Sequence, residues 1–379
     1  MNQKKYAGLC IAIAICQLVF TQTLPDKHRV LQQMELANKY FMVKYPDPGL
    51  PITTDKTRPS NIWTRSVYYE GLMALYHLSP KHKFLKYADR WGDSHQWNLP
   101  GGPATRSADN QCCGQTYIDL YTLQHQKKQI GNIKESIDNM LQSNKIDDWW
   151  WIDALQMGMP VFAKLGVLYH DNRYFQRMYE MYMHTKTEEG GGLYNSKDSL
   201  WWRDKSFVSP YKEPNGKNCY WSRGNGWVIA ALVRVLQIMP ESAIGYQEYK
   251  HTFMEMMQKI ASLQRSDGFW NVSLLDPDYF GGKETSGTSL FVYGMAWGIH
   301  KRWLNREIYL PIVEKAWHGL TTYALHPDGM LGYVQGTGKE PKDGQPVTYN
   351  HVPDFEDYGL GCFLLAGSEI YQLAPDRNK

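Results

Sequence analysis

The chain has 379 residues, of which 43% are hydrophobic and 21% charged, and this globular composition excludes an intrinsically disordered protein. A formal net charge of +3 is too small to predict a broad surface for nucleic acid or another polyanion. The 14 Trp, 26 Tyr and 12 Phe predict either a large aromatic core or a cleft lined with rings, as in many carbohydrate sites.

Residues 1–22 have the pattern of a secretory signal peptide. Two lysines precede an apolar run from Ala7 to Phe20, which is too short to span a bilayer. We therefore expect an exported protein, periplasmic or secreted, without stable membrane insertion once the signal is removed. A membrane anchor or a buried first helix is the alternative. Lipid anchoring is not expected, because Cys16 after Ile15 is a poor match to a lipoprotein cleavage site.

Four cysteines follow the signal segment: Cys112, Cys113, Cys219 and Cys362. None has the spacing of a metal site with other Cys or with His, so we expect no metal ion, and no motif indicates a cofactor. A chain of this size does not need a disulfide framework for stability. We expect buried thiols, and a pair such as Cys113–Cys219 stays open.

Apolar residues recur at i, i+3, i+4 and i+7 along most of the chain, and almost no stretch alternates with the period of a strand. This periodicity predicts an all-α protein. The expected helices are twelve, at residues 27–44, 61–78, 81–97, 110–126, 130–143, 152–168, 171–186, 223–239, 246–263, 286–303, 307–325 and 357–373.

The connections between these helices alternate between short and long. Short connections follow the second, fourth, sixth, eighth and tenth helices, and a short connection joins two helices into an antiparallel hairpin. We therefore expect an (α/α)6 toroid of six helical hairpins, forming one domain over residues 24–379. The alternative, a helical-repeat solenoid, is not supported by any repeat of 34 or 40 residues. The long connections all fall on one rim, at residues 45–60, 98–109, 144–151, 187–222, 264–285 and 326–356.

Two aspartates lie where inner helices are expected to begin at this rim. For either Asp109 or Asp153 alone, capping of the helix N-terminus is the simpler interpretation. Asp153 argues against capping, because helical periodicity already surrounds it and Trp151 precedes it. Burial beside an aromatic ring would raise the pKa of that carboxyl group toward a value suited to a general acid.

The same rim carries tryptophans and an arginine. Arg223 lies in the string Trp221-Ser222-Arg223-Gly224-Asn225-Gly226-Trp227, and a guanidinium group offers a fork to a carboxylate. Pairing of Arg223 with Asp204 or Asp153 is the structural alternative, and the tryptophans at 149–151 include at least one expected core residue. The residues predicted to bind substrate are Trp63, Gln115, Trp151, Trp221, Arg223, Asn225, Trp227, Thr285 and Ser286.

Several longer strings together resemble one enzyme family. They include Ser107-Ala108-Asp109, Trp151-Ile152-Asp153-Ala154-Leu155, Trp202-Arg203-Asp204, the string around Arg223, and Glu284-Thr285-Ser286-Gly287-Thr288. On these residues, and over essentially the whole chain after the signal, the sequence resembles the unsaturated uronyl hydrolases of glycoside hydrolase families 88 and 105.

The resemblance implies an exo-acting enzyme that removes a 4,5-unsaturated uronic acid from the non-reducing end of an oligosaccharide left by a polysaccharide lyase. It implies Asp153 as the acid/base and Asp109 as its partner carboxylate. The chemistry implied is hydration of a vinyl ether: C4 is protonated, positive charge develops at C5, water adds there, and the hemiketal opens.

One departure from the family leaves the substrate open. Residues 187–222 lack the histidine that family members often carry there, and Trp201-Trp202-Arg203-Asp204 stands instead. The leaving sugar is either rhamnose from pectic rhamnogalacturonan or sulfated rhamnose from an algal polysaccharide such as ulvan. In the second case the sulfate would meet a basic residue of this loop, namely Arg203, Lys205, Lys212 or Lys217.

Two other functions are compatible with the sequence. One is a different (α/α)6 catalyst, either an inverting glycosidase or a polysaccharide lyase that uses Tyr220, Tyr358 or His351 as its base. The other is a non-catalytic saccharide-binding protein that has kept the toroid, against which the pair Asp109 and Asp153 argues.

Overall fold

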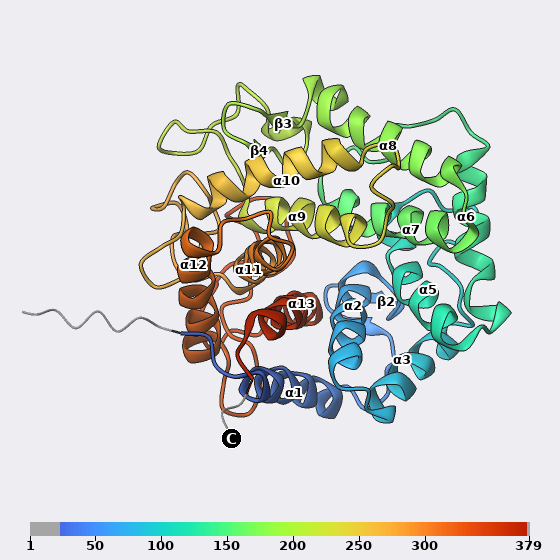
Figure 1. Cartoon of the computed structure of the whole chain (residues 1–379), viewed down its shortest axis with the longest axis horizontal. Helices are drawn as coiled ribbons and strands as arrows, with labels where there is room; N and C mark the ends of the chain where they lie inside the picture. The colour runs from blue at the N-terminus through green and yellow to red at the C-terminus, as the bar shows by residue number, and fades with distance from the viewer. Residues whose placement is uncertain (1–22, 377–379) are drawn as a thin grey trace, which may run out of the picture.

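A computed structural model describes residues 23–376, so the predicted signal peptide lies outside the described residues. Helices dominate this part of the chain and form two concentric layers (Figure 1). The inner layer consists of α2 (Trp63–Leu78), α4 (Ala108–Gln111) with α5 (Cys113–Gln124), α7 (Asp153–Tyr169), α9 (Ser222–Leu236), α11 (Thr285–His300) and α13 (Asp357–Leu373). The outer layer consists of α1 (Lys27–Lys44), α3 (His82–Ser94), α6 (Gly131–Leu141), α8 (Asn172–Thr187), α10 (Tyr246–Ala261) and α12 (Arg306–Gly319).

The inner helices form a closed ring. Each contacts the next in chain order, and α13 returns to pack against α2, so the (α/α)6 toroid predicted from the sequence is confirmed. Burial follows the two layers. Every residue of α11 from Thr285 to Ile299 is buried, whereas α10 buries one face, at Tyr246, Tyr249, Phe253, Met256, Met257 and Ile260. A stripe at that spacing is what an outer helix needs to cover one neighbour.

The ring closes through a tight contact between its first and last inner helices. At Gly361 of α13, an added Cβ would lie 2.2 Å from the carbonyl oxygen of Val67 in α2. At Gly71 of α2, it would lie 2.7 Å from the carbonyl oxygen of Gly361. Glycine is therefore required at both positions, because any side chain would push the two backbones apart.

The helix boundaries differ from the predictions in a few places. The fourth predicted helix, 110–126, is two helices, because the chain tightens at Cys112 and the Gln115 N–H donates to the Cys112 carbonyl three residues back, at 3.1 Å. The eleventh, 307–325, is α12 followed by a π-helical turn, Leu320–Ala324. All four cysteines in the described part are free and buried, as expected, and the pair Cys113–Cys219 that the sequence left open is not formed.

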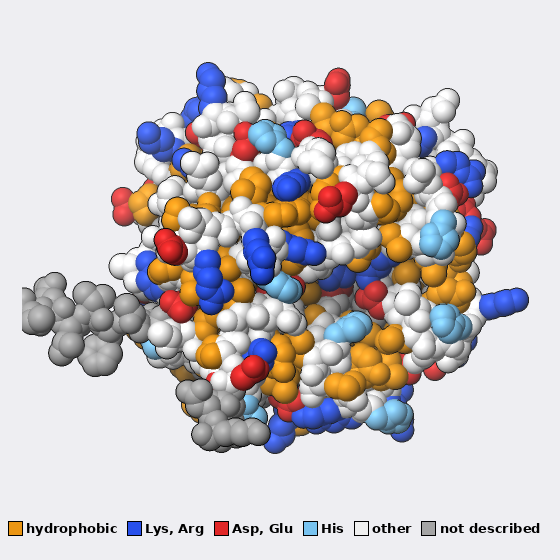
Figure 2. Space-filling view, in the orientation of Figure 1, with side chains coloured by type: hydrophobic (Ala, Val, Ile, Leu, Met, Phe, Trp, Pro, Cys, Tyr) orange, Lys and Arg blue, Asp and Glu red, His pale blue; other side chains and the backbone are white. Residues whose placement is uncertain are grey.

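The long connections all lie at the rim where the inner helices begin. They contain two short hairpins, β1 (Ile52–Thr53) with β2 (Thr57–Arg58) and β3 (Tyr194–Asn195) with β4 (Leu200–Trp201). No helix in residues 23–376 is both long and apolar enough to cross a bilayer. The face drawn in Figure 2 mixes acidic, basic and apolar side chains without one charge prevailing, in agreement with the small net charge.

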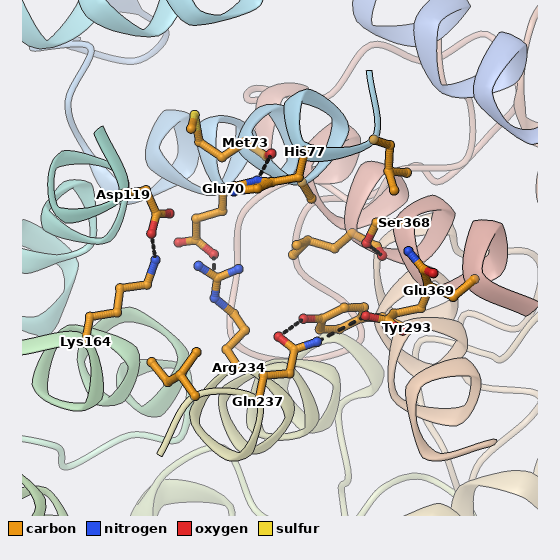
Figure 3. Close-up of a pocket in the computed structure, with 15 residues that line it drawn as sticks. Glu70, Met73, His77, Asp119, Lys164, Arg234, Gln237, Tyr293, Ser368 and Glu369 are labelled. Atoms are coloured by element: carbon orange, nitrogen blue, oxygen red, sulfur yellow. Dashed lines mark hydrogen bonds and ion pairs between the residues drawn. The ribbon is translucent and has the colours of Figure 1, made fainter. Parts of the chain in front are cut away.

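The opposite end of the ring holds a cavity of about 370 Å³ near the axis. Figure 3 shows side chains from the inner helices converging on it: Glu70, Asp119, Lys164, Arg234, Tyr293 and Glu369. The ions are paired across the ring. Glu70, whose side chain is fully buried, lies 3.6 Å from Arg234 Nε and accepts a 2.6 Å hydrogen bond from Gln156, while Lys164 pairs with Asp119.

We expect Arg234→Met to lower the free energy of unfolding by about 3 kcal/mol, because Glu70 is left as a buried charge without its cation. Adding Glu70→Gln to this variant removes the uncompensated charge, so the double variant should regain much of the loss. Urea denaturation followed by circular dichroism measures both. A single variant as stable as the wild type would contradict the structural role of this pair.

Candidate active site

The two predicted aspartates come together at the rim. Asp153 is the first residue of α7 and Asp109 the second residue of α4, and these two helices are in contact. A cavity of about 460 Å³ lies beside them, lined by Arg106, Ser107, Asp109, Lys145, Asp147, Asp148, Trp150, Trp151 and Arg203. Asp109 itself lines this space, which is large enough for a sugar, and Asp153 is joined to it through Arg203, another lining residue.

The start of α7 is held by another segment of the chain. The Ile152 N–H donates to the carbonyl of Arg203 at 3.0 Å, and Trp151 forms an antiparallel bridge with Asp204. The N-terminus of α7 is thus joined to residues 203–204, and the Asp153 carboxylate does not cap its own helix. It accepts instead a 3.0 Å hydrogen bond at Oδ2 from Arg203 Nε.

Both carboxyl groups have raised pKa values. Burial, and then the negative charge of Asp153, raise the pKa of Asp109 to about 7. Burial also raises the pKa of Asp153, against the opposing effect of the guanidinium groups of Arg203 and Arg223. The Oδ1 atom of Asp153 is buried and has no hydrogen-bond partner in the described chain. Two interacting carboxyl groups with raised pKa values keep a proton more readily than free carboxyl groups do, which is the property needed of a general acid.

The three consecutive tryptophans have three different surroundings. Trp149 is fully buried, packs edge-on against Phe162 and is the core residue expected among the three. Trp151 is nearly buried beside Asp153, and its ring lies 4.5 Å from that of Trp150, which is 48% exposed. Trp150 and Trp151 thus give the cavity an aromatic wall, and Trp150 adds a ring that the sequence did not single out.

The other predicted aromatic residues form a second cluster at the rim. Trp63, which is partly exposed, stacks on Tyr358 at 5.4 Å and meets the edge of Trp227 at 6.3 Å. Trp227 and Trp221 are almost fully buried, and Trp221 donates a 2.9 Å hydrogen bond to Gln335. Of this cluster, Trp63 is the best placed to offer a face to a sugar.

Arg223 bonds to the rim loop and, within residues 23–376, to no carboxylate. It lies between the rings of Trp221 and Tyr358 and is 1% exposed. It donates to the carbonyls of Gln335 at 2.8 Å and Gly336 at 2.7 Å. The alternative considered from the sequence, an ion pair of Arg223 with Asp204 or Asp153, is not formed; Arg203 bonds to both aspartates instead.

The remaining predicted binding residues are bonded within the protein. Asn225 accepts from the Trp201 N–H at 2.9 Å and donates to the Trp201 carbonyl at 3.0 Å, so it fastens β4 to α9. Thr285 donates to Gly332 and Ser286 to Glu284, while Gln115 bonds Gln156 and Arg234 deep in the ring. Contact of these residues with substrate stays a prediction; in this structure they hold loops and helices together.

Arg203 is the functional candidate whose place the sequence reasoning missed. Its Nη1 donates to Asp204 at 2.7 Å while Nε holds Asp153, and its guanidinium lies 5.7 Å from the Trp150 ring. The only signal in the sequence was the string Trp202-Arg203-Asp204, and nothing in it indicated a contact with a residue 50 positions earlier.

Comparison with known proteins agrees with this fold. Residues 33–374 match the family described as Glycosyl Hydrolase Family 88. A relative from Formosa agariphila, named unsaturated 3S-rhamnoglycuronyl hydrolase, is 36% identical over 236 residues, which cover 61% of this chain and 60% of the relative. The match thus spans less than two thirds of that relative's length.

Two solved structures cover nearly all of the chain. A glycosyl hydrolase family 88 protein from Bacteroides vulgatus is 33% identical with a TM-score of 0.83, covering 92% of this chain and 99% of its own. A protein titled a polysaccharide lyase is 32% identical with a TM-score of 0.82, covering 92% and 98%. Since the family match extends over most of the sequence, the chain belongs to Glycosyl Hydrolase Family 88.

Proposed function

We propose that the protein is an exo-acting hydrolase that removes a 4,5-unsaturated uronic acid from the non-reducing end of oligosaccharides produced by a lyase. The observation that carries this proposal is the pair Asp109 and Asp153, two carboxyl groups whose pKa values are raised at a cavity walled by Trp150 and Trp151. Membership of the family and the name of the Formosa relative support it.

In the proposed reaction, the Asp153 carboxyl group donates its proton to C4 of the unsaturated ring. Positive charge then develops at C5 and on the ring oxygen, and the nearby carboxylate of Asp109 stabilises it. A water molecule adds its oxygen to C5 and returns a proton to a carboxylate, so that the acid is restored. The hemiketal formed at C5 opens to a ketone, and the bond to the leaving sugar then breaks.

We propose rhamnose as the leaving sugar, with a 3-sulfated rhamnose as the first candidate and the unsulfated pectic sugar as the second. The printed name of the Formosa relative refers to a 3S-rhamnoglycuronyl substrate. Three basic residues, Arg106, Lys145 and Arg203, line the cavity, while Lys205, Lys212 and Lys217 are exposed on the loop that contains Arg203. Export through the segment 1–22 is part of the same proposal, because two lysines there precede a short apolar run.

A polysaccharide lyase is the second candidate, because one solved structure with 32% identity carries that title. The two activities change the ultraviolet absorbance in opposite directions. A lyase creates the unsaturated uronide that absorbs in the near ultraviolet, whereas the proposed hydrolase destroys it.

We expect the purified protein to abolish the ultraviolet absorbance of a disaccharide whose unsaturated uronate is linked to 3-sulfated rhamnose. The reaction consumes the conjugated double bond, and the unsulfated pectic disaccharide serves as the comparison. Absorbance that stays constant on both disaccharides would contradict the hydrolase. An increase on intact polysaccharide would establish the lyase instead.

Asp153→Asn should lower kcat by at least about a thousandfold, because the amide has no proton of suitable acidity to give to C4. The matched control is Asp148→Asn, which changes a carboxylate of the same cavity that is already bonded to Arg106 at 2.9 Å. We expect a much smaller effect from this control. Comparable losses in both variants would remove the special role of Asp153.

Asp109→Asn should stabilise the folded protein increasingly as the pH rises from about 4 to 7. The pKa of Asp109 is about 7 when folded and near 4 when unfolded, so wild-type stability falls as the unfolded chain ionises in this range. The neutral amide of the variant does not ionise and so avoids this loss. We expect the free energy of unfolding of Asp109→Asn, relative to the wild type, to be higher at pH 8 than at pH 4 by an amount on the order of 2 kcal/mol. Urea denaturation at the two pH values measures it, and equal gains at both would refute the raised pKa.

A further inference from the structure

Within residues 23–376, Arg203 is the one cation that forms an ion pair with the proposed acid Asp153, and its surroundings fix where its guanidinium group lies. Nε donates to Asp153 Oδ2 at 3.0 Å and Nη1 to Asp204 Oδ2 at 2.7 Å. The third nitrogen, Nη2, has no hydrogen-bond partner within residues 23–376, and the side chain is 16% exposed at the cavity wall. The guanidinium group therefore holds two aspartates and keeps a donor for something else.

The backbone around Arg203 is anchored, so only the side chain is free to move. The Arg203 carbonyl accepts from Ile152 at 3.0 Å, and Asp204 bridges to Trp151. Two residues earlier, Asn225 holds Trp201 through both its N–H and its carbonyl. A ligand that attracts the guanidinium group thus changes its contact with Asp153 without displacing the loop.

A uronate brings its own carboxylate into this cavity and needs a cation there. Two of the three lining cations are already bound in pairs: Arg106 grips Asp148 with two nitrogens, and Lys145 lies 3.0 Å from Asp147. Arg223, the partner predicted from the sequence, is buried and bonded to backbone carbonyls. All three cations keep N–H groups that are unbonded within residues 23–376, but of the three only Arg203 also bonds Asp153, so it is the one through which a bound carboxylate would act on the acid. Guanidinium groups bind carboxylates well.

The charges around Asp153 determine what happens to its protonation when Arg203 binds another anion. The charged groups that face it are Asp109 from α4, Arg203 and Asp204 from the segment after β4, and Arg223 from α9. Arg203 is the cation that bonds its carboxylate directly. When that cation turns to another anion, burial and the charge of Asp109 both favour the neutral acid at Asp153.

We propose that Arg203 is a positioning residue through which the substrate prepares its own acid: the uronate carboxylate draws the guanidinium group away from Asp153, and Asp153 then takes up a proton. The inference rests on the proposed function and assigns the receptor for the substrate carboxylate within it. One proton passes from solvent to the Asp153 carboxylate, no covalent bond of the ligand changes, and the acid is formed only when a uronate is present.

Calorimetric titration of D-glucuronate into the protein tests this without turnover, because a saturated uronate has no vinyl ether. Titrations in two buffers of different ionisation enthalpy, repeated from pH 5 to 8, give the number of protons taken up on binding. We expect uptake approaching one proton in the wild type and its loss in Asp153→Asn.

Arg203→Met should weaken glucuronate binding at least about tenfold, because the cation that binds its carboxylate is absent. The proton uptake should also fall, because ligand binding no longer removes a guanidinium group from Asp153. Arg203→Lys keeps the charge and should restore part of both. Lys197→Met, an exposed lysine in the turn between β3 and β4, is the matched control and should behave as the wild type. Circular dichroism checks that each variant is folded.

Two results would overturn the inference: proton uptake that is the same in Arg203→Met and Arg203→Lys as in the wild type, or wild-type binding without uptake at any pH. The proposed function fails by a different measurement, when ultraviolet absorbance stays constant on both disaccharides. Proton uptake that depends on Arg203, together with constant absorbance, would keep the carboxylate receptor and reject the hydrolase.

Discussion

The inner helices of the ring share one direction, and this direction decides where the long connections and the candidate site lie. Because an antiparallel outer helix lies between each inner element and the next along the chain, the inner helices all run the same way and begin at one rim. The long connections must then gather at that rim, and the free N–H groups of several helices point toward it. Two aspartates at such positions, Asp109 and Asp153, have raised pKa values because burial there outweighs the favourable dipole.

Much of the fold was readable from the sequence because it is governed by local rules. The periodicity of apolar residues located the helices, and the alternation of short and long connections predicted the toroid. The division of one predicted helix at Cys112 was not readable, because both halves keep helical periodicity and Cys112 itself has helical backbone angles. At this point the Gln115 N–H bonds to the carbonyl three residues back instead of four, and such a local change cannot be recognised from the residue types.

The two carboxylates of the candidate site could be predicted from the sequence, whereas the partners of its arginines could not. Asp109 and Asp153 stand beside helix starts in the sequence, whereas the partner of Asp153 comes from a loop 50 residues later. A string such as that around Arg223 indicates that an arginine is constrained, but not whether it meets a ligand or a backbone carbonyl. In this fold the constraint on Arg223 and Asn225 comes from fastening loops, and that fastening places Arg203 against α7.

The contact of Gly71 and Gly361 joins the first and the last inner helix of the ring, and it has a consequence for the order of folding. The inner wall is complete only when α13, near the C-terminus, reaches α2, some 290 residues earlier in the sequence. Until then the apolar faces of α2 and α11 that α13 covers stay exposed. Contacts between segments so far apart in the sequence form slowly. The ring therefore closes late in folding, because its last contact needs both α2 and α13.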